Sequence, residues 1–255
     1  MKKISIIGAG PGDPDLITVK GAKLIQEAEV LIWTDSLIPK QITELAPPNC
    51  EKIPTSSLTL EQIIETLIDR YNKNKKIVRL HDGDPCLYGA ISEQICRLTD
   101  VGIDIEVIPG ISAYQAASAT LKSELTIPNE VQTIILSRAH GRTGIPENEN
   151  LEKLAAIKAS LCLYLSARHV KEIQATLLKH YSPSTPVAIC HRISWKDEWI
   201  KIVPLSEIAK TTANQNLIRT TLYIVSPAFA IHQRRSKLYS ADHSHLFRRA
   251  KKTII

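Results

Sequence analysis

Glycine and aspartate cluster in three short segments, each directly after an apolar stretch of the chain. The first is Gly8-Ala9-Gly10-Pro11-Gly12-Asp13, the second runs over 81–89 and contains Asp82-Gly83-Asp84, and the third is Pro109-Gly110-Ile111-Ser112. Glycine is used where the backbone turns sharply or approaches another group closely. A site made of such turns recognises its ligand mainly through backbone amide and carbonyl groups. The three segments therefore predict a ligand site.

The first segment is similar to the G-x-G-x-x-G fingerprint of dinucleotide-binding proteins, but Asp13 stands where the third glycine belongs. A carboxylate there would face the pyrophosphate of the dinucleotide, which the fingerprint avoids. The residue types at this position disfavour a nicotinamide cofactor, so other segments must identify the ligand.

The elements that position these segments alternate between strand and helix. The helix at 59–71 has a capping box, Thr59 with Gln62, and an apolar face. Strands are expected at 4–7, 30–33, 77–80, 105–108, 133–136, 160–165, 187–190 and 221–225, and further helices at 18–28, 89–98, 113–121, 151–158 and 168–179. This alternation predicts an α/β fold with mostly parallel sheets, whose ligands bind at the carboxyl ends of strands.

The length and composition fit two such domains. The chain has 255 residues, of which 44% are hydrophobic, and a break between about 110 and 130 divides it into two α/β halves with a ligand cleft between them. We expect an N-terminal domain at 1–112, a C-terminal domain at 113–232 and a basic tail at 233–255.

The cysteines and the apolar runs indicate the cellular compartment of the protein and bear on whether it has a metal site or a membrane span. The five cysteines are odd in number and show no C-x-x-C spacing, which favours a reducing cytoplasm and disfavours a structural metal site. No apolar run approaches the roughly 18 residues that span a bilayer. We therefore expect a cytoplasmic protein with no metal and no membrane contact.

The net charge lies in the tail. The segment 234–252 carries seven Lys or Arg residues against one acid, which accounts for the whole formal charge of +6. The tail has no stacking or groove-reading pattern, so a solvated or partner-facing segment is favoured over a nucleic-acid contact.

Taken together and in this order, the three glycine segments resemble those of the tetrapyrrole methylases, which use S-adenosyl-L-methionine (SAM) to methylate corrin and porphyrin precursors. The resemblance covers nearly the whole chain. Further segments are similar to the branch of that family that methylates carbon 11 of precorrin-4 on the way to cobalamin: 9–18, 33–37, 124–128, 137–143 and the tail at 236–248.

The resemblance implies the fold of this family, the class III SAM methyltransferases, which have two α/β domains, usually form homodimers and bind SAM in the cleft. S-adenosyl-L-homocysteine is the product. By motif matching, the expected cofactor-binding residues are Pro11, the turn Asp82, Gly83 and Asp84, and Leu87, Ser112, Ala113 and Leu165. We expect Asp84→Ala to abolish SAM binding and to leave the fold intact.

The implied reaction is an in-line methyl transfer to a ring carbon, for which positioning alone supplies an effective molarity of about 10⁵ M or more. Tyr88 and Glu93 are the catalytic candidates near the methyl-transfer end. A substrate with several carboxylate arms calls for cations around it. The substrate-binding candidates are Asp13, Arg138, His140 and Arg142, with Arg79 as a further cation.

Two alternatives stay open. The first keeps the fold and changes the acceptor to another precorrin carbon, uroporphyrinogen, ribosomal RNA or a modified histidine. Ala90 disfavours uroporphyrinogen, because the related methylases have an arginine at that position. The second is a non-catalytic sensor or carrier that binds SAM or a tetrapyrrole.

Overall fold

The computed structural model describes residues 3–139, 144–230, 243–244 and 246–249. The chain forms two compact units, one made of Met1–Thr120 with Cys190–Ile200 and the other of Leu121–Ile189 with Lys201–Ile255. The first unit thus takes up an eleven-residue segment from the second half of the chain. The sequence analysis did not anticipate this return of the chain.

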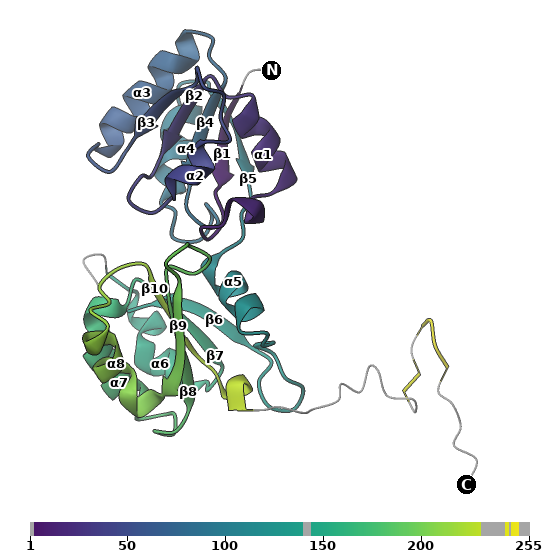
Figure 1. The fold of residues 1–255 in the computed structure, drawn as a ribbon, viewed down its shortest axis with the longest axis vertical. Helices are drawn as coiled ribbons and strands as arrows, with labels where there is room; N and C mark the ends of the chain where they lie inside the picture. The colour runs from purple at the N-terminus through teal and green to yellow at the C-terminus, as the bar shows by residue number, and fades with distance from the viewer. Residues whose placement is uncertain (1–2, 140–143, 231–242, 245, 250–255) are drawn as a thin grey trace. The chain divides into compact units, whose positions relative to one another are not determined.

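The first unit is built on a five-stranded sheet with the order β3-β2-β4-β1-β5, and each neighbouring pair of strands is parallel. Its strands are β1 (Lys3–Gly8), β2 (Val30–Trp33), β3 (Glu51–Pro54), β4 (Ile77–His81) and β5 (Asp104–Ile108). The connecting helices are α1 (Val19–Gln26), α2 (Lys40–Thr43), α3 (Leu60–Asn72) and α4 (Ile91–Thr99), and α5 (Ala113–Thr120) follows β5 (Figure 1).

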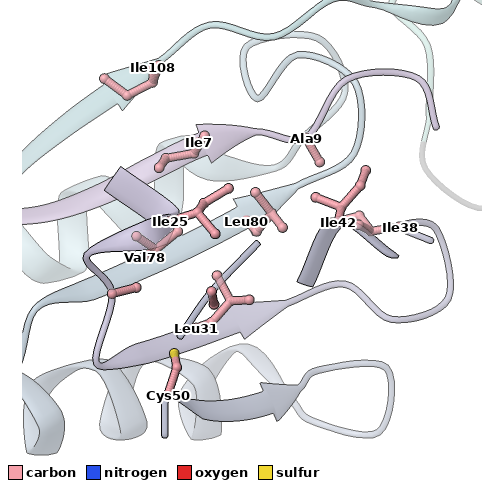
Figure 2. Close-up of a cluster of buried hydrophobic side chains, with 12 residues drawn as sticks. Ile7, Ala9, Ile25, Leu31, Ile38, Ile42, Cys50, Val78, Leu80 and Ile108 are labelled. Carbon is pink, nitrogen blue, oxygen red and sulfur yellow. The ribbon is translucent and has the colours of Figure 1, made fainter. Parts of the chain in front are cut away.

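Alternate residues of the central strands fill two cores, one on each face of this sheet. Ile7, Leu31 and Leu80 pack with Ile25 of α1 and Ile42 of α2, as Figure 2 shows. The intervening side chains enter a second cluster, which includes Ile4, Val30, Ile32 and Ile77 with Ile63, Ile64 and Leu67 of α3 and Leu98 of α4. Because both faces are covered, the strands read as continuous apolar runs.

Side-chain caps start two of the predicted helices where the sequence indicates. Thr59 accepts a hydrogen bond from the Gln62 amide and the Gln62 side chain accepts one from the Thr59 amide, so the predicted capping box is confirmed. Thr18 caps α1 in the same way through the Gly21 amide. Helix α4 begins at Ile91 rather than at Gly89, because Ala90 has a left-handed backbone.

The second unit is built on another five-stranded sheet, with the order β6-β7-β10-β8-β9. Strands β6 and β7 are parallel, whereas β7 and β10 are antiparallel. The elements are β6 (Ile134–Arg138), α6 (Leu151–Ala156), β7 (Ser160–Tyr164), α7 (Val170–Leu177), β8 (Pro186–His191), β9 (Trp199–Pro204), α8 (Ile208–Asn214) and β10 (Thr221–Val225).

No helix in the described ranges is both long enough and apolar enough to cross a membrane.

Candidate active site

The three glycine segments meet at the carboxyl ends of β1, β4 and β5. Gly10 and Gly83 exchange backbone hydrogen bonds of 3.2 and 2.8 Å, which joins the first turn to the second. A Cβ atom added at Gly8 would lie 2.6 Å from backbone atoms of both Gly83 and Gly110. No side chain fits between these turns, so their backbones form one continuous surface at this edge of the sheet.

Asp84 fastens the second turn to the third. One carboxylate oxygen accepts from the Gly110 amide at 2.9 Å, and the other accepts from the Cys86 amide at 2.8 Å. Both oxygens are therefore engaged by backbone amides. The carboxylate holds two turns in register, so a change at Asp84 would alter the position of both turns.

The second turn ends in strained backbone beside Gly89. Tyr88 and Ala90 both have positive φ angles, 58° and 50°, which non-glycine residues adopt at a cost of about 1 kcal/mol or more. A Cβ at Gly89 would collide with the Pro85 carbonyl oxygen. The Tyr88 side chain is 44% exposed and Leu87 is half-buried. Such strain is typical of ligand-binding turns.

Glu93 lies on the first turn of α4 and forms an ion pair with Arg97, 2.6 Å between Oε1 and the guanidinium. Its side chain is 59% exposed. The structure thus places this candidate on an exposed helix face, with its carboxylate already paired. Its catalytic role stays a prediction.

The third turn leads into α5 through a reciprocal cap. The Ser112 amide donates to the Gln115 side chain at 2.9 Å, and the Ser112 carbonyl accepts from the Gln115 amide at 3.0 Å. Ser112 is buried, and its Cα lies 3.8 Å from where a Gly83 side chain would start. Ser112 and Ala113, from the third segment, therefore lie beside the Asp82–Asp84 turn of the second.

Two buried basic side chains, Arg79 and His81, belong to β4, the strand that leads into the second turn. Arg79 contacts Gln94, Thr34 and two backbone carbonyls at 3.3–3.5 Å, and burial lowers its pKa to about 10. Burial, together with the charge of Arg79, lowers the pKa of His81 to about 3, so His81 is neutral at pH 7. Arg79 is thus a buried cation, rather than the exposed substrate contact that its residue type suggests.

The returning segment, 190–200, clamps the first glycine turn. The Trp195 indole N–H donates to the Pro11 carbonyl at 3.0 Å, and the Ser194 hydroxyl accepts from the Asp13 amide at 2.9 Å. A side chain at Gly12 would collide with the indole ring. Sequence reasoning missed this clamp. The feature of the sequence that could have indicated the clamp is Trp195, which stands in a short polar stretch between two apolar strands.

A pocket of about 680 Å³ lies beside the clamp, and all its lining residues belong to the first unit. The walls combine two tryptophans with cations and carboxylates. The lining residues come from three segments: Gly12, Asp13 and Pro14; Trp33, Asp35, Ser36, Ile38, Pro39, Lys40 and Gln41; and Arg192, Ser194, Trp195, Lys196 and Asp197. Asp13 is the one predicted substrate-binding residue among them.

In the second unit, Arg138 is the last residue of β6 and Leu165 follows the last residue of β7, so both lie at the carboxyl ends of these neighbouring strands. Arg138 pairs in register with Tyr164, the residue before Leu165. The Ser166 hydroxyl ties the two strand ends together, since it accepts from the Ala139 amide and donates to the Tyr164 carbonyl. Leu165 has a positive φ of 53° and is 68% exposed, which is unusual for a leucine and consistent with a ligand contact.

The Arg138 guanidinium donates to the Gly144 carbonyl at 3.0 Å. The other two predicted substrate-binding residues, His140 and Arg142, lie outside the described residues.

Among the described residues no group of three or more His, Cys, Asp or Glu side chains could hold a metal ion. All five cysteines are free thiols.

Several known proteins are similar to this chain over most of its length. A cobalt-precorrin-4 C(11)-methyltransferase of Methanocaldococcus jannaschii is 41% identical, and the match covers 98% of each chain. A precorrin-4 C(11)-methyltransferase of Pseudomonas aeruginosa is 42% identical over 96% of this chain and 98% of that protein.

Two solved structures are also similar to this chain in fold and in sequence. The X-ray structure of the cobalt precorrin-4 methyltransferase CbiF has a TM-score of 0.87 and 39% identity, and the match covers 89% of this chain and 95% of that one. The uroporphyrin-III C-methyltransferase of Thermus thermophilus, complexed with S-adenosyl homocysteine, has a TM-score of 0.74 and 25% identity over 89% and 92% of the two chains. Residues 3–209 match the Tetrapyrrole (Corrin/Porphyrin) Methylases, and the chain belongs to that family.

Proposed function

We propose that this enzyme transfers a methyl group from SAM to carbon 11 of precorrin-4 or cobalt-precorrin-4, as a step of cobalamin biosynthesis. The observation that carries the proposal is identity of about 40% over nearly the full length to relatives named for this reaction. The sequence analysis reached the same branch from the glycine turns and the 124–128 and 137–143 segments.

The residues present fit SAM. The Gly8, Gly83 and Gly110 turns are so close that a Cβ atom would fill the space between them, and their backbone amides and carbonyls form the surface. SAM, when bound, supplies a methyl group that is already activated by the positive charge on sulfur. The protein then has to hold the acceptor carbon in line with the methyl group, which is a matter of positioning. It also has to exclude water and to accept the proton that the macrocycle releases.

We assign the cofactor contacts to the residues that the motifs indicated. The Asp82-Gly83-Asp84 turn and Leu87 bind the amino-acid and ribose end, and Pro11 borders the cofactor. Ser112 and Ala113 continue the surface, and Leu165 packs against the adenine. The convergence of the three turns in the first unit and the exposed, strained Leu165 support these roles.

The clamp of Trp195 and Ser194 on Pro11 and Asp13 fixes the first turn. Asp84 fixes the second turn against the third.

In this proposal Tyr88, exposed at the end of the second turn, lies nearest the transferred methyl group. Arg138, His140 and Arg142 bind acidic arms of the tetrapyrrole, and we retain Glu93 as a catalytic candidate beside Tyr88. Homodimer formation and a cytoplasmic location, which the sequence analysis expects, are part of the same proposal.

Anaerobic incubation of the purified protein with SAM and either precorrin-4 or cobalt-precorrin-4, followed by mass spectrometry, tests this function. We expect a mass gain of one methyl group and formation of S-adenosyl-L-homocysteine. The preferred acceptor identifies the metallation state of the substrate. A protein that binds SAM but transfers no methyl group to either acceptor would contradict the proposal and favour another acceptor or a binding role.

A further inference from the structure

The segment at the end of the second turn, Tyr88-Gly89-Ala90, has a conformation that its own residues do not favour. Tyr88 and Ala90 have positive φ angles of 58° and 50°. A Cβ atom at Gly89 would lie 2.2 Å from the Pro85 carbonyl oxygen, so the backbone between them is also crowded. Strained backbone of this kind persists only where the surrounding structure holds it. Neighbouring groups must therefore keep this segment in place.

The Gln94 side chain holds the last residue of the segment. Helix α4 has no side-chain cap at Ala90, and the Gln94 side-chain NH2 group donates to the Ala90 carbonyl at 3.2 Å. Gln94 is 5% exposed, so this contact is shielded from water and is stronger than an exposed one. The contact ties the carbonyl of a strained residue to the helix that follows it.

Arg79 fixes which way the Gln94 amide points. The Arg79 Nε–H donates to the Gln94 side-chain oxygen at 3.5 Å. A guanidinium only donates hydrogen bonds, and the oxygen of a glutamine side chain only accepts them. The oxygen of Gln94 must therefore face Arg79, which directs the NH2 group at Ala90.

The ends of two strands hold Arg79 in turn. Its guanidinium donates to the Ile32 and Leu80 carbonyls at 3.4 and 3.3 Å and to the Thr34 hydroxyl at 3.4 Å. Thr34 follows the last residue of β2, and Leu80 belongs to β4. The strained segment is thus anchored to the sheet through this guanidinium.

Stability does not explain a charged residue at this position. Arg79 is 4% exposed, and the groups that it contacts are neutral and 3.3–3.5 Å away, which is long for hydrogen bonds. Removing such a charge from water is costly, and apolar residues of similar volume often stabilise a protein equally well or better. Arg79 and Gln94 are therefore better explained by the geometry that they impose than by the stability that they add.

We propose that Gln94 and Arg79 are positioning residues for methyl transfer. They hold the Ala90 carbonyl, and thereby keep Tyr88 in the conformation in which it lies beside the transferred methyl group. The inference rests on the proposed function, which places Tyr88 there.

The start of the second turn is held by other contacts. Asp84 binds the Gly110 amide, and Gly10 and Gly83 exchange backbone hydrogen bonds. Loss of the Gln94 contact should therefore move the end of the turn and leave SAM binding nearly unchanged. A misplacement of about 1 Å can lower a rate about a hundredfold.

The variant Gln94→Met, which has a similar shape but neither polar group, tests the pair. We expect kcat for methyl transfer to fall about tenfold or more, whereas the KM and Kd for SAM change less than about threefold. Gln94→Glu keeps an acceptor for Arg79 and lacks the donor for Ala90, so it should lose activity as well.

The matched control is Gln174→Met in the second unit. The Gln174 side chain also bridges two elements, since it donates to the Ser206 carbonyl at 3.1 Å and accepts from the Ala209 amide at 2.8 Å. Its removal takes away contacts of the same kind at a place that the proposal does not involve. The kcat of this variant should equal that of the unmodified enzyme.

A double-mutant cycle separates a shared role from two independent ones. Arg79→Met should lower kcat as Gln94→Met does, and the double variant should lower it no further, because both residues act through the Ala90 carbonyl. Additive losses would contradict the proposal.

Hydrogen exchange over residues 85–95 measures the same effect without turnover. In Gln94→Met, but not in Gln174→Met, we expect these amides to exchange about tenfold faster. If the unmodified enzyme transfers the methyl group and Gln94→Met keeps its kcat, the positioning role is wrong and the function stands. If no acceptor is methylated, the proposed function fails, and unchanged exchange in Gln94→Met would then overturn this inference as well, whereas faster exchange would support it.

Discussion

Asp84 shows how a residue chosen for its ligand chemistry can act through backbone. Sequence reasoning expected it to cradle SAM, and the structure shows its two carboxylate oxygens on the Gly110 and Cys86 amides. A change at Asp84 therefore moves two turns, whether or not the carboxylate touches the cofactor.

We predict that Asp84→Ala lowers SAM affinity at least tenfold and lowers the free energy of unfolding by about 2 kcal/mol, because two hydrogen bonds to a charged acceptor are lost. Calorimetric titration with SAM and urea unfolding measure the two effects. Asp84→Asn keeps one acceptor oxygen and should give an intermediate result. Unchanged SAM affinity in the alanine variant would contradict the assignment of the second turn.

His81 gives the enzyme a stability that depends on pH. Its pKa is about 3 in the folded protein and about 6.5 when unfolded, so the unfolded chain binds more protons in between. The contribution is therefore complete above about pH 6.5 and is lost as the pH falls toward 3.

We predict that the free energy of unfolding falls by about 1 kcal/mol from this residue alone between pH 7.0 and pH 5.5. In His81→Leu this part of the decrease should disappear, because the side chain no longer titrates. Urea unfolding at the two pH values provides the comparison. Equal decreases in the variant and the unmodified protein would show that other groups carry the pH dependence.

At the scale of elements, the meeting of three loops depends on glycine in places where backbone touches backbone. At Gly110 a Cβ atom would collide with the Gly83 carbonyl oxygen and lie 2.8 Å from the Gly8 Cα. Neither neighbour is a flexible side chain, so the strain would have to move a whole turn.

We therefore predict that Gly110→Ala lowers the free energy of unfolding by about 2–3 kcal/mol and weakens SAM binding. Gly144→Ala is the matched control, because a Cβ there meets nothing within 4 Å. It should change stability by less than about 0.5 kcal/mol. Urea unfolding of both variants makes the comparison, and similar stabilities would argue against the close approach of the turns.

Several elements could be predicted from residue patterns because packing and local chemistry agree. The buried run Val30–Trp33 is a strand with the predicted bounds, and so is Thr221–Val225. In contrast, the edge strand β3, Glu51–Pro54, is mostly exposed and carries no apolar pattern. Strand β9 and helix α8 were also not predicted. Edge strands depend on pairing with a distant partner, which local sequence does not reveal.

Only part of the candidate site could be predicted from the sequence. The three glycine turns were found because parallel strands bring their carboxyl ends to one edge. The clamp by Trp195 and the pocket at Lys40 and Lys196 were missed, since they depend on a segment about 180 residues along the chain from the turn it covers. Pairing over that separation leaves no periodic signal.

At the scale of the whole molecule, the two units are built on sheets of different kinds, the first all parallel and the second with parallel and antiparallel pairs. Each unit has a five-stranded sheet, and each has strained residues after a strand, such as Tyr88 and Ala90 after β4 and Leu165 after β7. The family match over residues 3–209 includes both sheets except β10. The relatives of about 40% identity extend over nearly the whole chain and divide between acceptors with and without cobalt.

The position of the transferred methyl group tests the central claim most directly. The enzyme would be incubated anaerobically with SAM labelled with ¹³C in its methyl group and with each acceptor, and the product examined by NMR. We predict a single labelled methyl group on carbon 11 of one or both acceptors. A label on another ring carbon, or no transfer by a protein that binds SAM, would contradict the assignment.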